Sequence, residues 1–273
     1  MITFSNCKIN LGLRVLDKRP DGYHNIESIF YPIYWQDAIE IIQKDSKPSA
    51  ETTIDTTGNS LDINPKDNIC YKAYSILKKE FTELPPVHIH LHKTIPTGAG
   101  LGGGSANGAF TLMLLNKKFN LRLTEEELSA YALMLGSDCP FFINNKPCLA
   151  SGRGEKLLPL ALDLSAYKFI IVNPSIHVST SWAFSQLHKK ESSTSLQTII
   201  QQPITAWKNE LGNDFEDAIF ETYPAIKELK KHLYSAGAVY ASMSGSGSTV
   251  YGLFPKDVTP NMQLPLHYLV KEC

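Results

Sequence analysis

The sequence predicts an α+β fold, because segments with the two-residue alternation of strands are interspersed with helical segments that carry their own start and stop signals. Its 273 residues suggest one large domain or two of medium size. Hydrophobic residues make up 43% of the chain, so a core can form without disulfide bonds. Small, turn-forming residues at 151–154 mark a candidate boundary, and we expect domains over residues 1–152 and 153–273.

Charge and composition exclude several classes of protein. The formal net charge of −1 excludes a whole-protein electrostatic grip on nucleic acid or on an anionic membrane. No apolar run approaches the roughly 18 residues of a membrane-spanning helix, and the first residues lack the pattern of a secretory signal. Five widely spaced cysteines predict reduced thiols in the cytoplasm, without disulfides or a zinc site: Cys7, Cys70, Cys139, Cys148 and Cys273.

The first element is a strand over residues 2–15. Apolar side chains alternate there with Asn6, Lys8 and Asn10, which is typical of a strand with one buried face. The opposite face therefore carries an amide, a cation and an amide. A turn at residues 19–22 follows.

Two further strands are predicted over residues 26–35 and 38–43. The polar residues 44–63 predict an exposed hairpin or loop. Asn64-Pro65 then opens a helix that runs to about residue 81, with apolar side chains on its inner face.

Residues 87–92 alternate again and predict a strand with three histidines on one face. His88, His90 and His92 have a spacing that allows metal binding. A solvated strand face is the favoured interpretation, because no carboxylate or cysteine lies beside them in the sequence.

A glycine-rich segment at 96–105 is followed by a helix near 105–116. The next helix starts at Thr124 with a capping box to Glu127 and stops at Gly136. In the C-terminal half both element types occur. The predicted strands cover 169–172, 239–243 and 249–254, the predicted helices cover 215–220 and 225–235, and residues 189–202 predict a surface loop.

The glycine-rich segment indicates a phosphate-binding loop, because its bare backbone N–H groups and the positive end of the following helix can converge on an anion. Gly98, Gly100 and Gly103 spell the dinucleotide fingerprint, but a second helix follows where a parallel strand is required. A Walker A loop would have Lys before Ser105, and the protein-kinase motifs are missing. The loop is therefore of another kind.

Two further segments are weaker signals. Asp138 lies in a turn just past a predicted helix end, where a carboxylate is more often a cap. Residues 241–248 form a second small-residue loop between two predicted strands, which alone favours a plain hairpin.

Together these segments resemble the GHMP kinases, whose three ordered motifs match the strand with Lys8, the loop at 96–107 and Ser244-Gly245-Ser246-Gly247. Asp21-Gly22-Tyr23-His24 and the segment 136–142 are similar to one branch of that family. Its substrate is an alcohol of the non-mevalonate isoprenoid route that carries a cytidine diphosphate group. The resemblance implies a two-domain fold, with an N-terminal domain like domain 2 of ribosomal protein S5 and a ferredoxin-like C-terminal domain.

The resemblance also implies roles for individual residues. Asp138 would take the proton from the 2-hydroxyl of the substrate, and Lys8 would stabilise the developing charge. Ser105 would bind Mg²⁺, and Ala106 stands where the family usually has a second serine. The substrate would contact Asn10, Tyr23, His24, Thr180 and Phe184, with Trp182 as an alternative stacking partner. The ATP phosphates would contact Pro96, Thr97, Gly98, Ala99, Gly100, Leu101, Gly102, Gly103, Gly104, Ser105 and Ala106.

Two rival functions remain open. A kinase of the mevalonate or homoserine type would leave Tyr23 and His24 without a function, because its substrate has no cytosine. A nucleotide-binding relative without activity would be expected to have lost Lys8 or Asp138, and both are present. In each case the partners are small molecules, with neither nucleic acid nor membrane involved.

Overall fold

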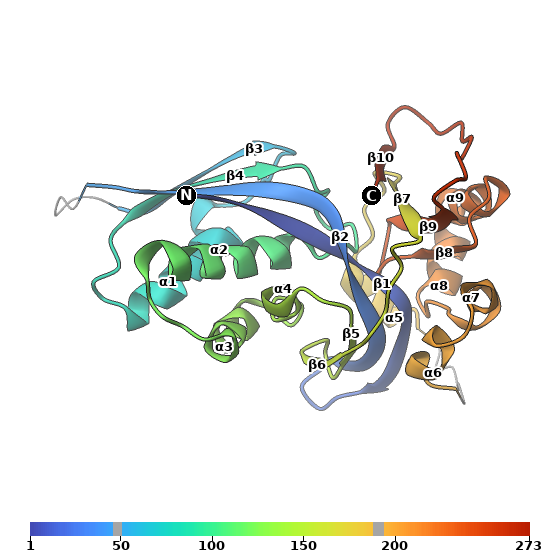
Figure 1. Ribbon diagram of the computed structural model, residues 1–273, viewed down its shortest axis with the longest axis horizontal. Coiled ribbons are helices and arrows are strands. Elements are labelled where there is room, and N and C mark those ends of the chain that lie inside the picture. The colour runs from blue at the N-terminus through green and yellow to red at the C-terminus, as the bar shows by residue number, and fades with distance from the viewer. Residues whose placement is uncertain (46–50, 188–193) are drawn as a thin grey trace. The chain divides into compact units, whose positions relative to one another are not determined.

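The computed structural model describes residues 1–45, 51–187 and 194–273 (Figure 1). Its helices and strands confirm the α+β class. The chain divides into two compact units, each built from separate stretches. Unit 1 comprises Met1–Cys7, Tyr34–Thr97 and Gly102–Lys146, and unit 2 comprises Lys8–Ile33, Gly98–Leu101 and Pro147–Cys273. The expected boundary between residues 152 and 153 stays a prediction.

Two long strands contribute to both units, β1 (Ile2–Lys18) and β2 (His24–Gln43). The strands expected at 26–35 and 38–43 are thus one strand, which continues through the polar Gln36 and the buried Asp37. Across the described ranges we find no helix with both the length and the apolar composition of a membrane span.

In unit 1, helices α1, α2 and α3 lie together on one side of strands β3 and β4 (Figure 1). β4 pairs with β3 in parallel and with the end of β2 antiparallel. The elements of this unit are β3 (Thr53–Gly58), the short 3₁₀ turn η1 (Pro65–Asp67), α1 (Ile69–Glu80), β4 (Val87–Lys93), α2 (Gly103–Phe119), α3 (Glu125–Leu135) and α4 (Phe141–Asn144).

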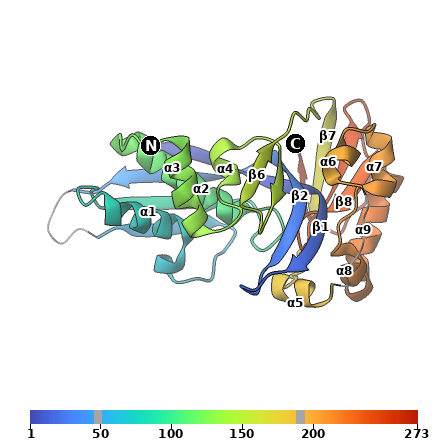
Figure 2. The ribbon, with the colours of Figure 1, turned by 90° about the horizontal axis from the view of Figure 1, so that it is seen from below.

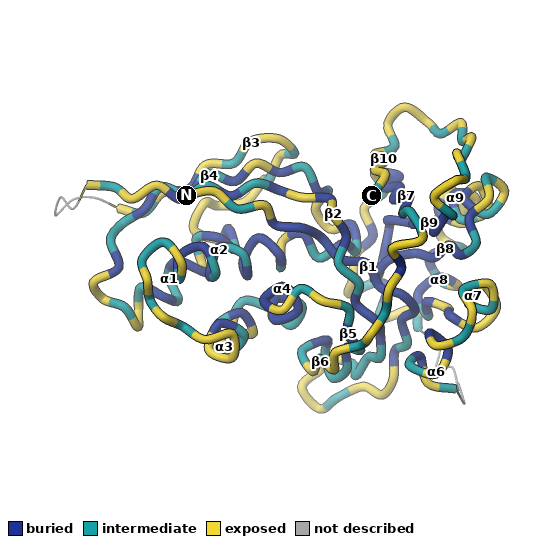
Figure 3. Tube along the Cα trace, in the orientation of Figure 1, coloured by how far each residue is buried: buried dark blue, intermediate teal, exposed yellow. Residues whose placement is uncertain are grey.

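Most sequence predictions for unit 1 are confirmed. The helix expected at 64–81 is η1 followed by α1, each started by an asparagine cap. The capping box of Thr124 and Glu127 is present, and α3 ends at Gly136. α2 is buried along most of its length, as its dark trace in Figure 3 shows. Gly108 lets the neighbouring helices approach closely, because a Cβ there would come within 2.9 Å of Ile69 on α1 and 3.1 Å of Leu135 on α3.

The prediction of an exposed hairpin or loop over residues 44–63 is wrong for β3. Its composition gives little strand signal, since Ile54 is its one buried apolar side chain. Pairing with β4 supplies the missing stabilisation, and threonines of β3 contact the histidine face of β4. Thr53 Oγ1 lies 2.9 Å from His88 Nδ1. That face is partly exposed, as expected of a solvated strand face.

Unit 2 contains a four-stranded antiparallel sheet in the order β10-β7-β9-β8, and α8 and α9 pack on it (Figures 1 and 2). β5 pairs with both β2 and β6. The elements are β5 (Cys148–Ser151), β6 (Lys156–Pro159), β7 (Tyr167–Asn173), α5 (Thr180–Ser185), α6 (Leu196–Ile200), α7 (Ile204–Glu210), α8 (Glu216–Thr222), α9 (Pro224–Ser235), β8 (Tyr240–Met243), β9 (Val250–Pro255) and β10 (Leu269–Glu272).

The predicted strands and helices of unit 2 are confirmed as β7, β8, β9, α8 and α9. α9 buries Ile226, Leu229 and Leu233, which recur at the helical spacing. The surface loop expected at 189–202 lies partly outside the described residues, and it is wrong for α6. Ser195 caps that helix, and its apolar side chains are buried.

Candidate active site

The polar face of β1 is buried, which corrects the expectation of a strand with one buried face. Every residue from Ser5 to Leu13 is buried, and the exposed fraction is 4% for Lys8 and 2% for Asn10. Burying a cation and an amide is costly unless both are hydrogen-bonded. This stretch of β1 is therefore built around a polar site.

Lys8 and Asn10 contact each other within unit 2. The Lys8 ammonium donates to Asn10 Oδ1 at 2.6 Å and lies 4.1 Å from the ring centroid of Phe30. Asn10 Nδ2 donates to Ser28 Oγ at 2.8 Å. The ring face and the amide oxygen are both electron-rich, so both attract the positive charge of the ammonium.

The glycine-rich segment at 96–105 is called the phosphate loop below. Its central glycines pack against the second small-residue loop, residues 241–248, also within unit 2. Gly100 has a φ of +76°, and a Cβ there would come within 2.0 Å of Ser244 O. Ser244 Oγ donates to Gly100 O at 2.7 Å and accepts from Asn10 N at 3.3 Å. Lys8 N donates to Leu101 O at 2.9 Å. Three segments far apart in the sequence therefore meet here.

The remaining part of the phosphate loop and Asp138 belong to unit 1. Gly102 caps α2 with a left-handed backbone and leaves the first N–H groups of the helix without a side-chain cap. Asp138 lies in the turn between α3 and α4, next to Cys139. Burial raises the pKa of the Cys139 thiol to about 12, the Asp138 charge adds to this rise, and a hydrogen bond with Ser105 opposes it. Ser105 and Asp138 thus lie beside the same neutral thiol.

The expected base-binding residues gather in unit 2. His24 and Phe184 are stacked with ring centroids 5.0 Å apart and planes at 16°. Trp182, the alternative partner, lies edge-on to Tyr223 instead. Two rings in direct contact leave no room for a base between them. A base would therefore stack on an outer face of this pair or on Tyr23, which is 56% exposed.

Tyr23 is held by the turn that precedes β2. Asp21 Oδ1 accepts from Tyr23 N at 3.2 Å, and the Arg19 guanidinium beside Asp21 keeps the pKa of that carboxyl below its ordinary value. The guanidinium of Arg153 lies 4.9 Å from the Tyr23 ring centroid. Thr180, the last expected substrate residue, is 3.0 Å from Ser246 between their hydroxyl oxygens.

Sequence reasoning missed a buried network in unit 1 that flanks the phosphate loop. Asp37, which is 0% exposed, forms an ion pair with Lys93. Its Oδ1 also accepts from Thr94 N at 2.7 Å and Ile95 N at 2.9 Å, before the loop. Its Oδ2 accepts from Asn107 Nδ2 at 2.9 Å, on α2 just beyond the glycine-rich segment at 96–105. One carboxylate therefore binds both flanks, although nothing in the local sequence marks Asp37 as buried.

We expect Lys93→Met to lower the free energy of unfolding by about 3–5 kcal/mol, because it leaves the buried Asp37 carboxylate without its cation. Denaturant unfolding measures this change. The matched control is Lys231→Met, which removes the exposed pair with Glu228 and leaves stability nearly unchanged. Equal effects for the two variants would contradict a structural role for the buried pair.

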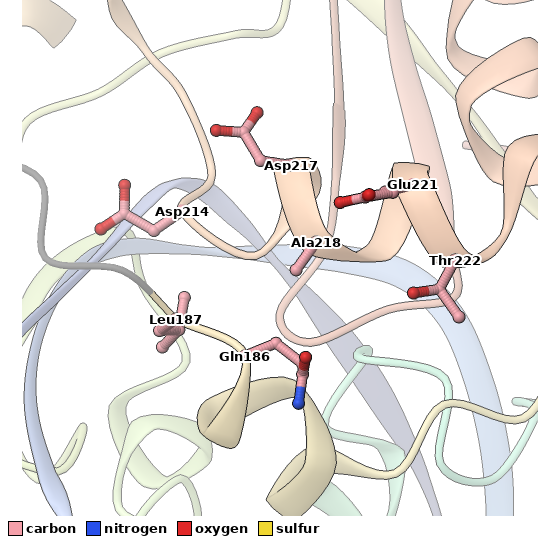
Figure 4. A pocket seen from close by; sticks show the side chains of 7 residues that line it. All are labelled: Gln186, Leu187, Asp214, Asp217, Ala218, Glu221 and Thr222. Atoms are coloured by element: carbon pink, nitrogen blue, oxygen red, sulfur yellow. The ribbon is translucent and has the colours of Figure 1, made fainter.

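A separate pocket of unit 2 has an acidic wall (Figure 4). Its volume is about 410 Å³, and three carboxylates line it, those of Asp214, Asp217 and Glu221. Their negative charges would repel phosphate groups. None of the expected ATP-binding or substrate-binding residues lines it. Within the described part of the chain, no group of three or more His, Cys, Asp or Glu side chains is arranged to hold a metal ion.

Comparison with known proteins adds independent support for the sequence resemblance. Residues 68–146 match the family model "GHMP kinases N terminal domain", and residues 196–263 match "GHMP kinases C terminal". A 4-diphosphocytidyl-2-C-methyl-D-erythritol kinase of Bacteroides fragilis (strain YCH46) is 53% identical over 255 residues, which cover 93% of this chain and 92% of that protein.

Solved structures of GHMP kinases are also similar to this chain. A crystal structure of 4-(cytidine 5'-diphospho)-2C-methyl-D-erythritol kinase matches with a TM-score of 0.78 at 29% identity, over 93% of this chain and 90% of that chain. The mevalonate kinase of Methanococcus jannaschii, at 15% identity, shares the fold with a TM-score of 0.71 over 94% and 92% of the two chains. The two-domain fold expected from the motifs is confirmed. The chain belongs to the GHMP kinases and, within them, to the family of 4-diphosphocytidyl-2-C-methyl-D-erythritol kinases.

Proposed function

We propose that this chain transfers the γ-phosphoryl group of ATP to the 2-hydroxyl of 4-(cytidine 5'-diphospho)-2-C-methyl-D-erythritol. The relatives named for that reaction support the proposal. The observation that carries it is the pairing of His24 with Phe184, next to Tyr23, in the same unit as Lys8. A kinase for mevalonate or homoserine has no use for such an aromatic, hydrogen-bonding group.

Phosphoryl transfer requires mainly positioning and charge neutralisation, since its loose transition state spreads charge over three oxygens. Asp138 would accept the proton of the 2-hydroxyl while the new P–O bond forms and the bond to ADP breaks. Lys8 would stabilise the charge that develops on the reacting oxygens. The uncapped start of α2 and the glycine loop offer N–H groups to the ATP phosphates.

For Mg²⁺ we propose the Ser105 hydroxyl as the protein ligand, because Mg²⁺ prefers oxygen donors and in kinases usually takes few protein ligands besides substrate phosphates. Ser105 would hold the ion. When bound, Mg²⁺ neutralises phosphate charge.

The test is an assay of ADP release with three acceptors: the cytidyl substrate, mevalonate and homoserine. We expect turnover with the cytidyl substrate alone. Turnover with mevalonate or homoserine instead would support the corresponding rival kinase. ATP binding without turnover of any acceptor would support the inactive relative.

Replacing Tyr23 or Phe184 by Leu is expected to raise the KM for the cytidyl substrate about 5- to 150-fold, because base stacking on an aromatic ring contributes about 1–3 kcal/mol. The KM for ATP should stay nearly unchanged. Steady-state kinetics with each substrate varied in turn measure both values. Tyr34→Leu serves as the control, since that tyrosine is exposed on β2 in unit 1. A rise in the KM for ATP alone would assign these rings to the adenine.

A further inference from the structure

We infer that Ser28 is a positioning residue for phosphoryl transfer, which acts through Asn10 on the ammonium of Lys8. This inference rests on the proposed function. Ser28 lies on β2, is 0% exposed and belongs to unit 2 together with Asn10 and Lys8. None of the sequence motifs marks it.

The hydrogen-bond direction at Ser28 is fixed by the backbone. Its hydroxyl donates to Gly12 O at 2.7 Å, and a hydroxyl has only one hydrogen to donate. Toward Asn10, Ser28 Oγ can therefore act only as an acceptor. The Asn10 group that faces it must be the NH₂ group, and Nδ2 lies 2.8 Å from Oγ.

This orientation places the amide oxygen of Asn10 toward Lys8, at 2.6 Å from Nζ. The two ends of an asparagine amide have nearly the same shape, so packing alone does not choose between them. The reversed amide would set an NH₂ group against an ammonium, which are both donors. Ser28 thus determines whether the Asn10 amide presents its oxygen, a hydrogen-bond acceptor, to the Lys8 ammonium.

The backbone of Asn10 is held independently of Ser28. Asn10 N donates to Ser244 Oγ at 3.3 Å, and Tyr251 OH donates to Asn10 O at 2.7 Å. Loss of the Ser28 hydroxyl should leave the strand in place and free only the side-chain amide. The Lys8 ammonium would then lose its fixed position beside Phe30, and small misplacements of a catalytic group cost up to about 100-fold in rate.

The experiment compares Ser28→Thr with Ser28→Val, which have nearly the same shape and differ in the hydroxyl. Both variants carry the same packing disturbance, so a folding defect affects them alike. We expect Ser28→Thr to keep most of the wild-type kcat and Ser28→Val to lose about 10- to 100-fold, with little change in the KM for ATP. Thr111→Val is the control for loss of an equally buried hydroxyl, which donates to a backbone oxygen of its own helix, Asn107 O, instead.

A double-mutant cycle connects the effect to Lys8. In the Lys8→Met background, Ser28→Val should cause no further loss of kcat, because the group that it positions is gone. Equal kcat values for Ser28→Thr and Ser28→Val, or losses that multiply in the cycle, would overturn the inference.

An NMR measurement separates this inference from the proposed function. The side-chain signals of Asn10 Nδ2 and Lys8 Nζ are compared in the same two variants, without any acceptor present. We expect Ser28→Thr to keep both signals at the wild-type positions and Ser28→Val to move both. If the wild type turns over no acceptor, the proposed function fails, and unmoved signals in Ser28→Val would overturn the Ser28 assignment itself.

Discussion

Replacing Asp138 by Asn is expected to lower kcat by about 10²–10⁴-fold, because an amide cannot take the proton of the attacking hydroxyl. The fold should remain, since Asp138 is partly exposed in a turn whose backbone bond, from Cys139 N to Gly136 O, does not use the side chain. Steady-state kinetics at saturating cytidyl substrate measure the loss, and the melting temperature reports the fold.

The control for Asp138 is Asp163→Asn. Asp163 also lies in a turn, where its Oδ1 accepts from Ser165 N at 2.8 Å. This substitution should leave kcat unchanged. Near-normal turnover by Asp138→Asn would reduce Asp138 to a structural turn residue.

Lys8→Met is expected to lower kcat by about 10²–10³-fold while the KM for ATP changes little, because the cation is needed most when charge develops in the transition state. Met has nearly the same length and suits the contact with the Phe30 ring. We therefore expect only a small fall in the melting temperature. Kinetics with ATP and the cytidyl substrate varied in turn give the two constants.

Lys208→Met is the matched control, because the Lys208 ammonium also lies over an aromatic ring, 4.6 Å from the centroid of Tyr234. It should keep wild-type kcat. If Lys8→Met instead unfolds the chain at a much lower temperature and keeps its specific activity, then Lys8 is chiefly a structural residue.

The sequence predicted the elements whose stabilising interactions join residues close together along the chain. The capping box at Thr124, the stop at Gly136 and the apolar spacing of α9 each act within a few residues, so the sequence alone reveals them. The motifs around Lys8, the phosphate loop and Asp138 could also be recognised in the sequence. A phosphate-binding loop requires small residues, which leave the backbone N–H groups accessible, and the N-terminus of a helix. Their roles remain predictions until the variants above are measured.

Features that depend on distant partners were not predictable. β3 forms because β4 pairs with it, although its own residues are mostly polar. The polar stretch of β1 is held by residues far along the chain, such as Tyr251 and Ser244, which hydrogen-bond the backbone of Asn10. Ser28 and Asp37 look like ordinary strand residues in the sequence, and only the structure reveals the hydrogen bonds that they make with residues far along the chain.

The hydrogen bonds of the phosphate loop also determine when, during synthesis of the chain, the loop can reach its final conformation. Gly100 O accepts from Ser244, and Ala99 O accepts from Thr249 N at 3.4 Å. These partners leave the ribosome about 150 residues after the loop itself, which takes roughly 7–30 s at typical elongation rates. The loop is thus not a segment that reaches its conformation independently of the rest of the chain. A fragment ending at Lys146 would contain every glycine of the loop and none of these late partners, so it would lack the loop conformation of the full chain.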